Sequence, residues 1–238
     1  MSANLELLAR EAVAWMKAQS SATQAELYLS LSEERAVSRR EGERDGVEAA
    51  ESSGAGVRVV RDGRVGFAAA GGFDLGAIKD LYARAVEQLP HAEPDGRRVL
   101  PGPQAASADG ALAATLWDDE LFTSSWETVE ARLREAEAAA LAAPRVSRIM
   151  RVEYAESRGT VIVAGTSGLF ASERGGSASV SIVVTAEDGA EVQLGEGYRA
   201  ERRAAALDFR AAGREAGLRA SSLLGARRAK GGKRAVLF

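Results

Sequence analysis

The strongest constraint on the fold of this chain is the pair Asp62-Gly63, which separates two strand-like segments, residues 56–60 and 64–69. An Asp-Gly pair readily adopts the left-handed backbone of a two-residue hairpin turn. Upstream, residues 26–31 alternate between apolar and polar side chains, as expected for a strand with one buried face. Two further strand-like stretches are residues 36–40 and 46–52. The first third of the sequence therefore predicts an antiparallel meander.

Helical periodicity flanks this meander on both sides. The preceding segment carries apolar residues at helical spacing, with charged residues between them: Leu5, Leu8, Ala12, Trp15 and Met16. The following segment has a second apolar face, formed by Leu75, Ile78, Tyr82, Ala85 and Leu89. We therefore expect residues 1–89 to form one α+β domain, in which helices pack against the sheet.

Residues 90–110 have the composition of a linker, because four of the five prolines fall there together with several glycines. After the linker, Ser124 and Glu127 have the spacing of a capping box. This spacing predicts the start of an Ala-rich helix that runs to about Ala143, immediately before Pro144.

The second predicted domain, residues 111–238, follows the order of the first: helix, meander, helix. Its strand-like segments are separated by three predicted turns, at Gly165–Gly168, Gly175-Gly176 and Asp188-Gly189. A last helix is predicted over residues 209–224. Residues 234–238, which contain the apolar run Ala235–Phe238, are predicted to form a terminal strand that another segment or chain covers, because unpaired strands tend to aggregate. The predicted fold class is α+β, with two antiparallel-sheet units, each packed with helices, joined by a Pro/Gly-rich linker.

The chain has no cysteine and one histidine, His91, and this composition excludes most metal and nucleophile chemistry. Disulfides, thiolate nucleophiles and zinc–thiolate sites need cysteine, and a zinc site needs three or four converging ligands. His91 is interpreted as a solvated linker residue. The acidic run Asp118-Asp119-Glu120 could hold a metal through carboxylates alone, but it is interpreted as a charged approach to the next helix. We expect no catalytic, cofactor-binding or metal-binding residue in this chain, and no cofactor.

Two glycine-containing motifs resemble functional loops but lack the required context. Gly165-Thr166-Ser167-Gly168 invites comparison with a nucleophile elbow, which lies between a strand and a helix. Strands are predicted on both sides of it here, so a turn is expected. Gly54-Ala55-Gly56 precedes a strand, so the helix N-terminus that would hold a phosphate is missing.

The net charge of −3 provides no general attraction to nucleic acid or to anionic membranes. A local basic cluster follows the last predicted helix: Arg227, Arg228, Lys230, Lys233 and Arg234. It could contact nucleic acid or an acidic partner, or form a solvated connector at the negative end of the helix dipole. The connector is favoured, because no aromatic residues lie between the cations for base stacking.

The N-terminal segment is charged and has no apolar signal-peptide core. No apolar run in the chain approaches the roughly 20 residues of a membrane span. We therefore expect a cytoplasmic protein without a membrane partner.

Three groups of segments, taken in order, carry a family resemblance. The first is Gly54–Ala68, GAGVRVVRDGRVGFA. The second is a predicted hairpin that combines Thr166–Phe170, Ser177–Val184 and Ala186–Gly189. The third combines Gly213–Ala216, Leu224–Arg227 and Gly232–Phe238. Their sequence, order and spacing resemble the PmbA/TldD family, and the third group is more similar to PmbA, also called TldE, than to TldD.

The resemblance implies a cytoplasmic two-subunit metalloprotease system that trims or degrades unfolded peptides; an older family name is modulator of DNA gyrase. In that system TldD carries a His-Glu-x-x-x-His zinc motif, and PmbA/TldE is its partner without a metal site. The resemblance covers nearly the whole chain but only the N-terminal half of the family's usual length. The zinc motif would lie beyond Phe238, so no catalytic residue is carried over. Ala70-Gly71-Gly72 and Ser167 also depart from the residues more usual in the family.

The leading hypothesis is a non-catalytic N-terminal region of a PmbA/TldE-like subunit, which serves subunit assembly and substrate-strand binding. The expected partners are a TldD-like catalytic subunit or a second copy, and an unfolded peptide that adds as a strand to a free sheet edge. The alternative is a binding module for nucleic acid or a protein partner through the basic cluster, unrelated to proteolysis. A stand-alone hydrolase is the third and least favoured hypothesis.

Overall fold

The computed structural model describes residues 2–19, 23–103, 114–227, 231–233, 235 and 237. Its strands are β1 (Gln24–Arg40), β2 (Glu43–Arg61), β3 (Arg64–Gly71), β4 (Val146–Gly165), β5 (Phe170–Asp188) and β6 (Glu191–Glu201). Its main helices are α1 (Ser2–Gln19), α2 (Leu75–Gln88), α4 (Trp126–Leu141) and α5 (Phe209–Leu223). Two short 3₁₀ helices are η1 (Leu89–His91) and η2 (Ala204–Ala206). The fold class is α+β, as predicted.

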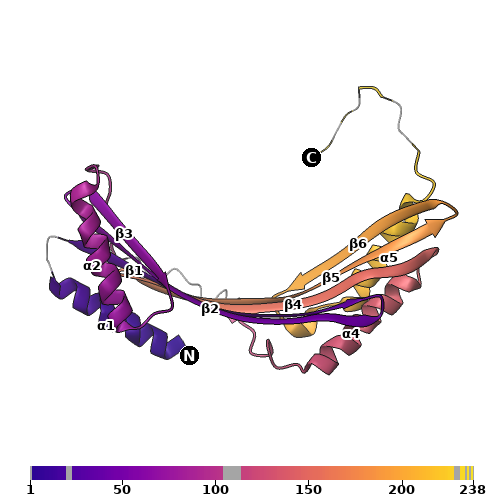
Figure 1. The fold of residues 1–238 in the computed structure, drawn as a ribbon, viewed down its shortest axis with the longest axis horizontal. Helices are drawn as coiled ribbons and strands as arrows, with labels where there is room; N and C mark the ends of the chain where they lie inside the picture. The colour runs from indigo at the N-terminus through magenta and orange to yellow at the C-terminus, as the bar shows by residue number, and fades with distance from the viewer. Residues whose placement is uncertain are drawn as a thin grey trace.

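The six strands pair antiparallel in one sheet with the order β3-β2-β1-β4-β5-β6. The predicted meanders, β1–β3 and β4–β6, join where β1 pairs with β4, with Glu33 opposite Arg158. The sequence predicted two antiparallel-sheet units; the structure differs in that their strands form one continuous sheet. Figure 1 shows this sheet as a long arch, with α1 and α2 at one end and α4 and α5 at the other. The division into domains at residues 90–110 stays a prediction.

The strands are longer than the sequence indicated. The segments predicted separately at residues 26–31 and 36–40 belong to the single strand β1. Charged residues at positions 33–35 interrupt the apolar alternation between them. In the structure this interruption lies at the middle of the arch, between two hydrophobic cores. We call this region the waist: residues 31–35 of β1 and the residues opposite them on β2 and β4.

The two cores lie on the same face of the sheet. Odd-numbered β1 side chains face the helices: Leu27 and Leu29 enter the first core, under α1 and α2, and Val37 enters the second, under α4 and α5. Alternate strand residues point to opposite faces, so the even-numbered β1 side chains point away from the helices. Figure 1 shows the four labelled helices on the convex side of the arch. Among the elements that the structure describes, no helix lies on the concave face.

Close contacts between glycine-containing strands and helices fix the position of the helices on the two edge strands. A Cβ atom added to Gly66 of β3 would lie 1.8 Å from the carbonyl oxygen of Ala85 in α2. On β6, a Cβ added to Gly197 would lie 1.9 Å from the carbonyl oxygen of Ala212 in α5. Each helix therefore rests directly on the backbone of an edge strand, at a distance that only glycine permits.

Of the four predicted turns, three are confirmed and one is wrong; at Asp188-Gly189 the chain turns between Asp188 of β5 and its strand partner Glu191 of β6. Asp62 and Gly63 have φ values of 50° and 72° and connect Arg61 to its strand partner Arg64. Gly165–Gly168 forms the turn between β4 and β5, in which the Gly168 N–H donates to the Gly165 carbonyl at 3.0 Å. The prediction of a turn at Gly175-Gly176 is wrong, because both residues lie inside β5. A Cβ at Gly176 would lie 2.5 Å from Leu121 Cδ1, so close packing of a loop accounts for this glycine.

The helices begin and end close to the predicted positions. The cap of α4 is corrected by one residue: the Ser125 side chain, not that of Ser124, accepts from the Thr128 N–H at 3.3 Å. The last helix, α5, ends just before the predicted residue 224. The predicted terminal strand falls partly outside the described residues. Ala235 and Leu237, which are described, are not in a strand.

Candidate functional site on the concave face

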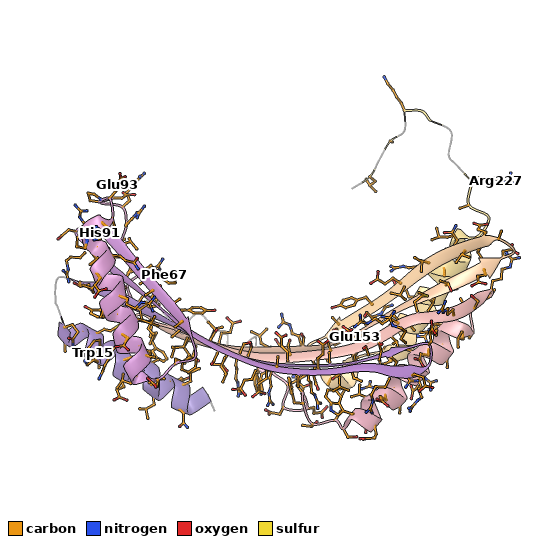
Figure 2. The ribbon with its side chains drawn as sticks, in the orientation of Figure 1. Trp15, Phe67, His91, Glu93, Glu153 and Arg227 are labelled. Carbon is orange, nitrogen blue, oxygen red and sulfur yellow. The ribbon has the colours of Figure 1, made fainter. Side chains whose placement is uncertain are left out.

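The single histidine and the acidic run lie in separate parts of the structure and do not form a common site. His91 ends η1 and is exposed near the outer end of the arch, far from Glu153 and Arg227 (Figure 2). Asp118 is buried, and its carboxylate accepts backbone N–H groups of Glu120 at 3.1 Å and Ala204 at 2.8 Å. Asp118 thus connects a loop to η2. Within the described ranges, no group of three or more His, Cys, Asp or Glu residues could hold a metal ion.

The convex side of the waist holds a partly buried ion-pair cluster. Arg35 pairs with Glu156 on the neighbouring strand, and Glu156 also accepts the Phe122 N–H at 2.9 Å. Arg158 pairs with Glu33 at 2.5 Å. The Arg35 guanidinium lies 4.8 Å from the ring centre of Trp126. These contacts satisfy charges at core-facing positions and attach the segment before α4 to the sheet.

Tyr154 lies next to this cluster and stacks on Phe209, with ring centres 5.8 Å apart. Burial raises the pKa of the Tyr154 hydroxyl well above its usual range, and the nearby Glu156 carboxylate raises it further. The phenol therefore stays neutral throughout the physiological pH range. Tyr154 is a core residue.

The concave side of the waist has a shallow hollow, lined largely by alanine, serine and glutamate residues. Its volume is about 310 Å³, and its lining includes Glu34, Glu48, Ala50, Ser157 and Ser177. A second hollow of about 890 Å³ continues from Ser177 towards β6 and η2. The backbone groups of β1 and β4 are already paired with neighbouring strands here, so this face offers side-chain contacts to another chain.

Exposed aromatic residues lie on both sides of the 310 Å³ hollow. Tyr28 and Phe67 lie towards one end of the arch, with 45% and 54% of their surfaces exposed, and Tyr198 lies towards the other, with 53%. Phe67 is labelled in Figure 2, on the concave side of β3. Isolated exposed aromatics are ordinary, but these share one face with the hollow. The concave face therefore offers both hydrogen-bonding and apolar contacts.

Sequence reasoning did not identify this surface. The available signal was the row of serines at Ser177, Ser179 and Ser181, which share the face opposite the apolar residues of β5. What the sequence could not show is that this row lies beside Glu34 and Glu48 of the other meander. That juxtaposition depends on the β1–β4 pairing.

Helix side chains occupy backbone groups of one residue on each outer edge of the sheet. On β3, the Gln88 side-chain amide donates to the Phe67 carbonyl at 2.8 Å and accepts the Phe67 N–H at 3.2 Å. On β6, Arg219 of α5 donates to the Glu196 carbonyl at 2.8 Å. An edge strand whose backbone groups are occupied is protected against pairing with another chain.

Replacing Gln88 by alanine should open the β3 edge. We expect a stability loss of about 1 kcal/mol, because two hydrogen bonds to an exposed strand are lost. We also expect concentration-dependent association, measured by sedimentation velocity. Glu87→Ala, at an exposed neighbouring position of α2, is the matched control. Equal, monomeric behaviour of the two variants would contradict a protective role of Gln88.

Family models match both halves of this architecture. A model described as PmbA/TldA metallopeptidase domain 1 matches residues 25–89, and one described as the PmbA/TldA metallopeptidase central domain matches residues 119–224. The chain belongs to the PmbA/TldD family. No curated protein sequence matches it significantly. The resemblance of the sequence to the PmbA/TldD family is thereby confirmed.

Solved structures share the fold at low sequence identity. One is a candidate modulator of a DNA gyrase from Thermotoga maritima, with a TM-score of 0.81 and 18% identity over 96% of this chain and 50% of that one. A second such candidate modulator, from Bacteroides thetaiotaomicron, has a TM-score of 0.76 and 17% identity over 94% and 51%. TldE from Thermococcus kodakarensis has a TM-score of 0.70 and 17% identity over 92% and 46%. This PmbA/TldD chain therefore spans about half the length of the structures it matches.

The basic cluster of this PmbA/TldD chain is described only in part. Arg227 and Lys233 are exposed, and Arg228, Lys230 and Arg234 lie outside the described residues. The use of the cluster for nucleic-acid binding stays a prediction. No helix in the described part of the chain is both long and apolar enough to cross a membrane.

Proposed function

We propose that this chain is a non-catalytic part of a TldD/TldE-type metalloprotease system that acts on unfolded peptides in the cytoplasm. Its role there is subunit assembly and the binding of extended substrate strands. The observation that carries this proposal is the continuous sheet of a PmbA/TldD family member, whose concave face has no helix among the described elements. An extended chain can add to a free edge of such a sheet largely through backbone hydrogen bonds.

The chemistry of the residues supports a non-catalytic role. The chain has no cysteine, and its single histidine is exposed at the end of η1. A metal-dependent peptidase needs converging ligands and an activated water. Catalysis is therefore assigned to a TldD-like partner, which binds this chain; self-association is the alternative mode of assembly.

The test is to purify this chain, a TldD-like subunit from the same genome, and their mixture. We expect the two to co-elute in size-exclusion chromatography and an unfolded peptide to be cleaved faster by the mixture than by either component. The control is the mixture with chelator, which should lose activity. A chain that stays monomeric, binds no TldD-like subunit and leaves peptidase activity unchanged would refute the proposal.

A further inference from the structure

One sheet edge lacks the helix side-chain contacts that β3 and β6 have at Phe67 and Glu196. β3 pairs only with residues 54–61 of β2, so the first half of β2 has a partner on one side only, β1. The Ser53 carbonyl accepts the Gly72 N–H at 2.8 Å on the side away from β1. Backbone groups alternate in direction along an antiparallel strand. The N–H and C=O groups of Glu51, Ala49 and Val47 therefore also point away from β1.

These outward groups are free in the described part of the chain. No described residue forms a hydrogen bond with the outward backbone groups of Val47, Ala49 or Glu51. All three residues are exposed. On the other strand with an unpaired half, β5, the outward N–H of Gly176 is bound by the Leu116 carbonyl at 3.0 Å, whereas no described residue binds the outward backbone groups of Ser172 and Arg174. We call residues 47–51 of β2 the open edge.

The charges around the open edge indicate what kind of peptide could bind there. Glu48 and Glu51 lie on opposite faces of β2, and Glu34 lies beside Glu48 on the lining of the 310 Å³ hollow. None of these three carboxylates has an ion-pair partner among the described residues, and Glu34, Glu48 and Glu51 are all exposed. By contrast, the nearby Arg44 is already paired with Glu130 of α4. Carboxylates without an ion-pair partner in the described structure therefore lie on both faces of the open edge.

We infer that the open edge binds a cationic extended peptide by strand addition. This rests on the proposed function and specifies it: the substrate strand is rich in lysine or arginine, and residues 47–51 of β2 receive it. Cations on the two faces of the added strand reach Glu48 and Glu51, as in opposite-charge cross-strand pairs. A second copy is disfavoured, because pairing two open edges would place these carboxylates against their equivalents.

The test uses the full chain and a fluorescently labelled peptide of alternating lysine and valine, followed by fluorescence anisotropy. We expect saturable binding that weakens with salt, and none for the corresponding glutamate–valine peptide. A lysine–valine peptide N-methylated on alternate residues, so that its pairing edge lacks N–H groups, should not bind. N-methylation leaves the protein unchanged, so this arm does not depend on how a variant folds.

Two proline variants provide a matched pair. Ala49→Pro removes an outward N–H from the open edge without removing a bond to β1. Ala69→Pro does the same on β3, at an exposed alanine beyond the residue that Gln88 protects. We expect Ala49→Pro to abolish peptide binding and Ala69→Pro to retain it. The double change Glu48→Lys with Glu51→Lys should weaken binding by at least about tenfold, because like charges are then opposed.

Three results would overturn the inference. The first is equal binding by the Ala49→Pro variant or by the N-methylated peptide. The second is that the unaltered chain forms a dimer and the Ala49→Pro variant does not, which would show that a second copy binds the open edge. The third is binding that appears only after residues 226–238 are removed, which would make the chain's own basic end the occupant. If the peptide binds equally well when the open edge is altered, this inference fails but the proposed function does not. If the chain neither binds a TldD-like subunit nor changes its activity, the proposed function fails but peptide binding at the open edge is not contradicted.

Discussion

Replacing Glu156 by alanine is expected to destabilise the protein by about 3 kcal/mol, because it leaves the largely buried Arg35 without its counter-ion. The Glu156 side chain is 1% exposed and that of Arg35 13%. The variant also removes the acceptor of the Phe122 N–H. The loss should appear as a lower midpoint of urea-induced unfolding, followed by circular dichroism.

Two controls test whether the stability loss comes from leaving a charge buried or from losing an ion pair as such. Glu135→Ala breaks the ion pair between Glu135 and Arg210, in which both side chains are about half exposed or more, and it should cost less than about 1 kcal/mol. Replacing Arg35 with methionine and Glu156 with leucine together should recover most of the loss, since neither charge then remains buried. If Glu156→Ala were no more harmful than Glu135→Ala, the waist cluster would not hold the segment before α4 as described.

Adding one methyl group at Gly197 is expected to cost about 3 kcal/mol, near the upper end for overpacking. The new Cβ would lie 1.9 Å from the Ala212 carbonyl oxygen and 3.0 Å from the Ala216 nitrogen. Both neighbours are helix backbone and cannot rotate away, so α5 would have to move off β6. Thermal or urea unfolding of Gly197→Ala measures this cost.

Gly71→Ala is the matched control, because it is also a strand glycine but its added Cβ would meet only the Ser53 carbonyl oxygen, at 3.9 Å. Alanine there should leave stability unchanged or raise it slightly, since glycine weakens strands. Gly66→Ala should repeat the Gly197 result at the other end of the arch. Wild-type stability of Gly197→Ala would show that α5 does not rest directly on β6.

Local patterns were sufficient for most of the elements. The hairpin at Asp62-Gly63 followed from its two left-handed residues, and α2 and α5 followed from their helical apolar faces. The error at Gly175-Gly176 has a physical cause: glycine also occurs where another segment approaches a strand closely. Sequence alone does not distinguish that use from a turn.

The candidate site was much less predictable than the elements. Glu48 and Ser177 are more than a hundred positions apart, yet both line the same hollow. The open edge also depends on an absence of pairing, because β3 is shorter than β2 and covers only half of it. Whether a backbone group is occupied is a property of the assembled sheet.

The sequence by itself determined the alternation within each strand, the helical faces, the hairpin turn and the lack of thiol chemistry, because each depends on residue type and on neighbours a few positions away. Only the tertiary structure decided that β1 pairs with β4, and with it the single arch, the ion pairs at the waist and the concave face. The physical reason is that strand pairing is made by backbone groups common to all residues. Which strands pair is therefore selected by the packing of the whole chain and not by any local pattern.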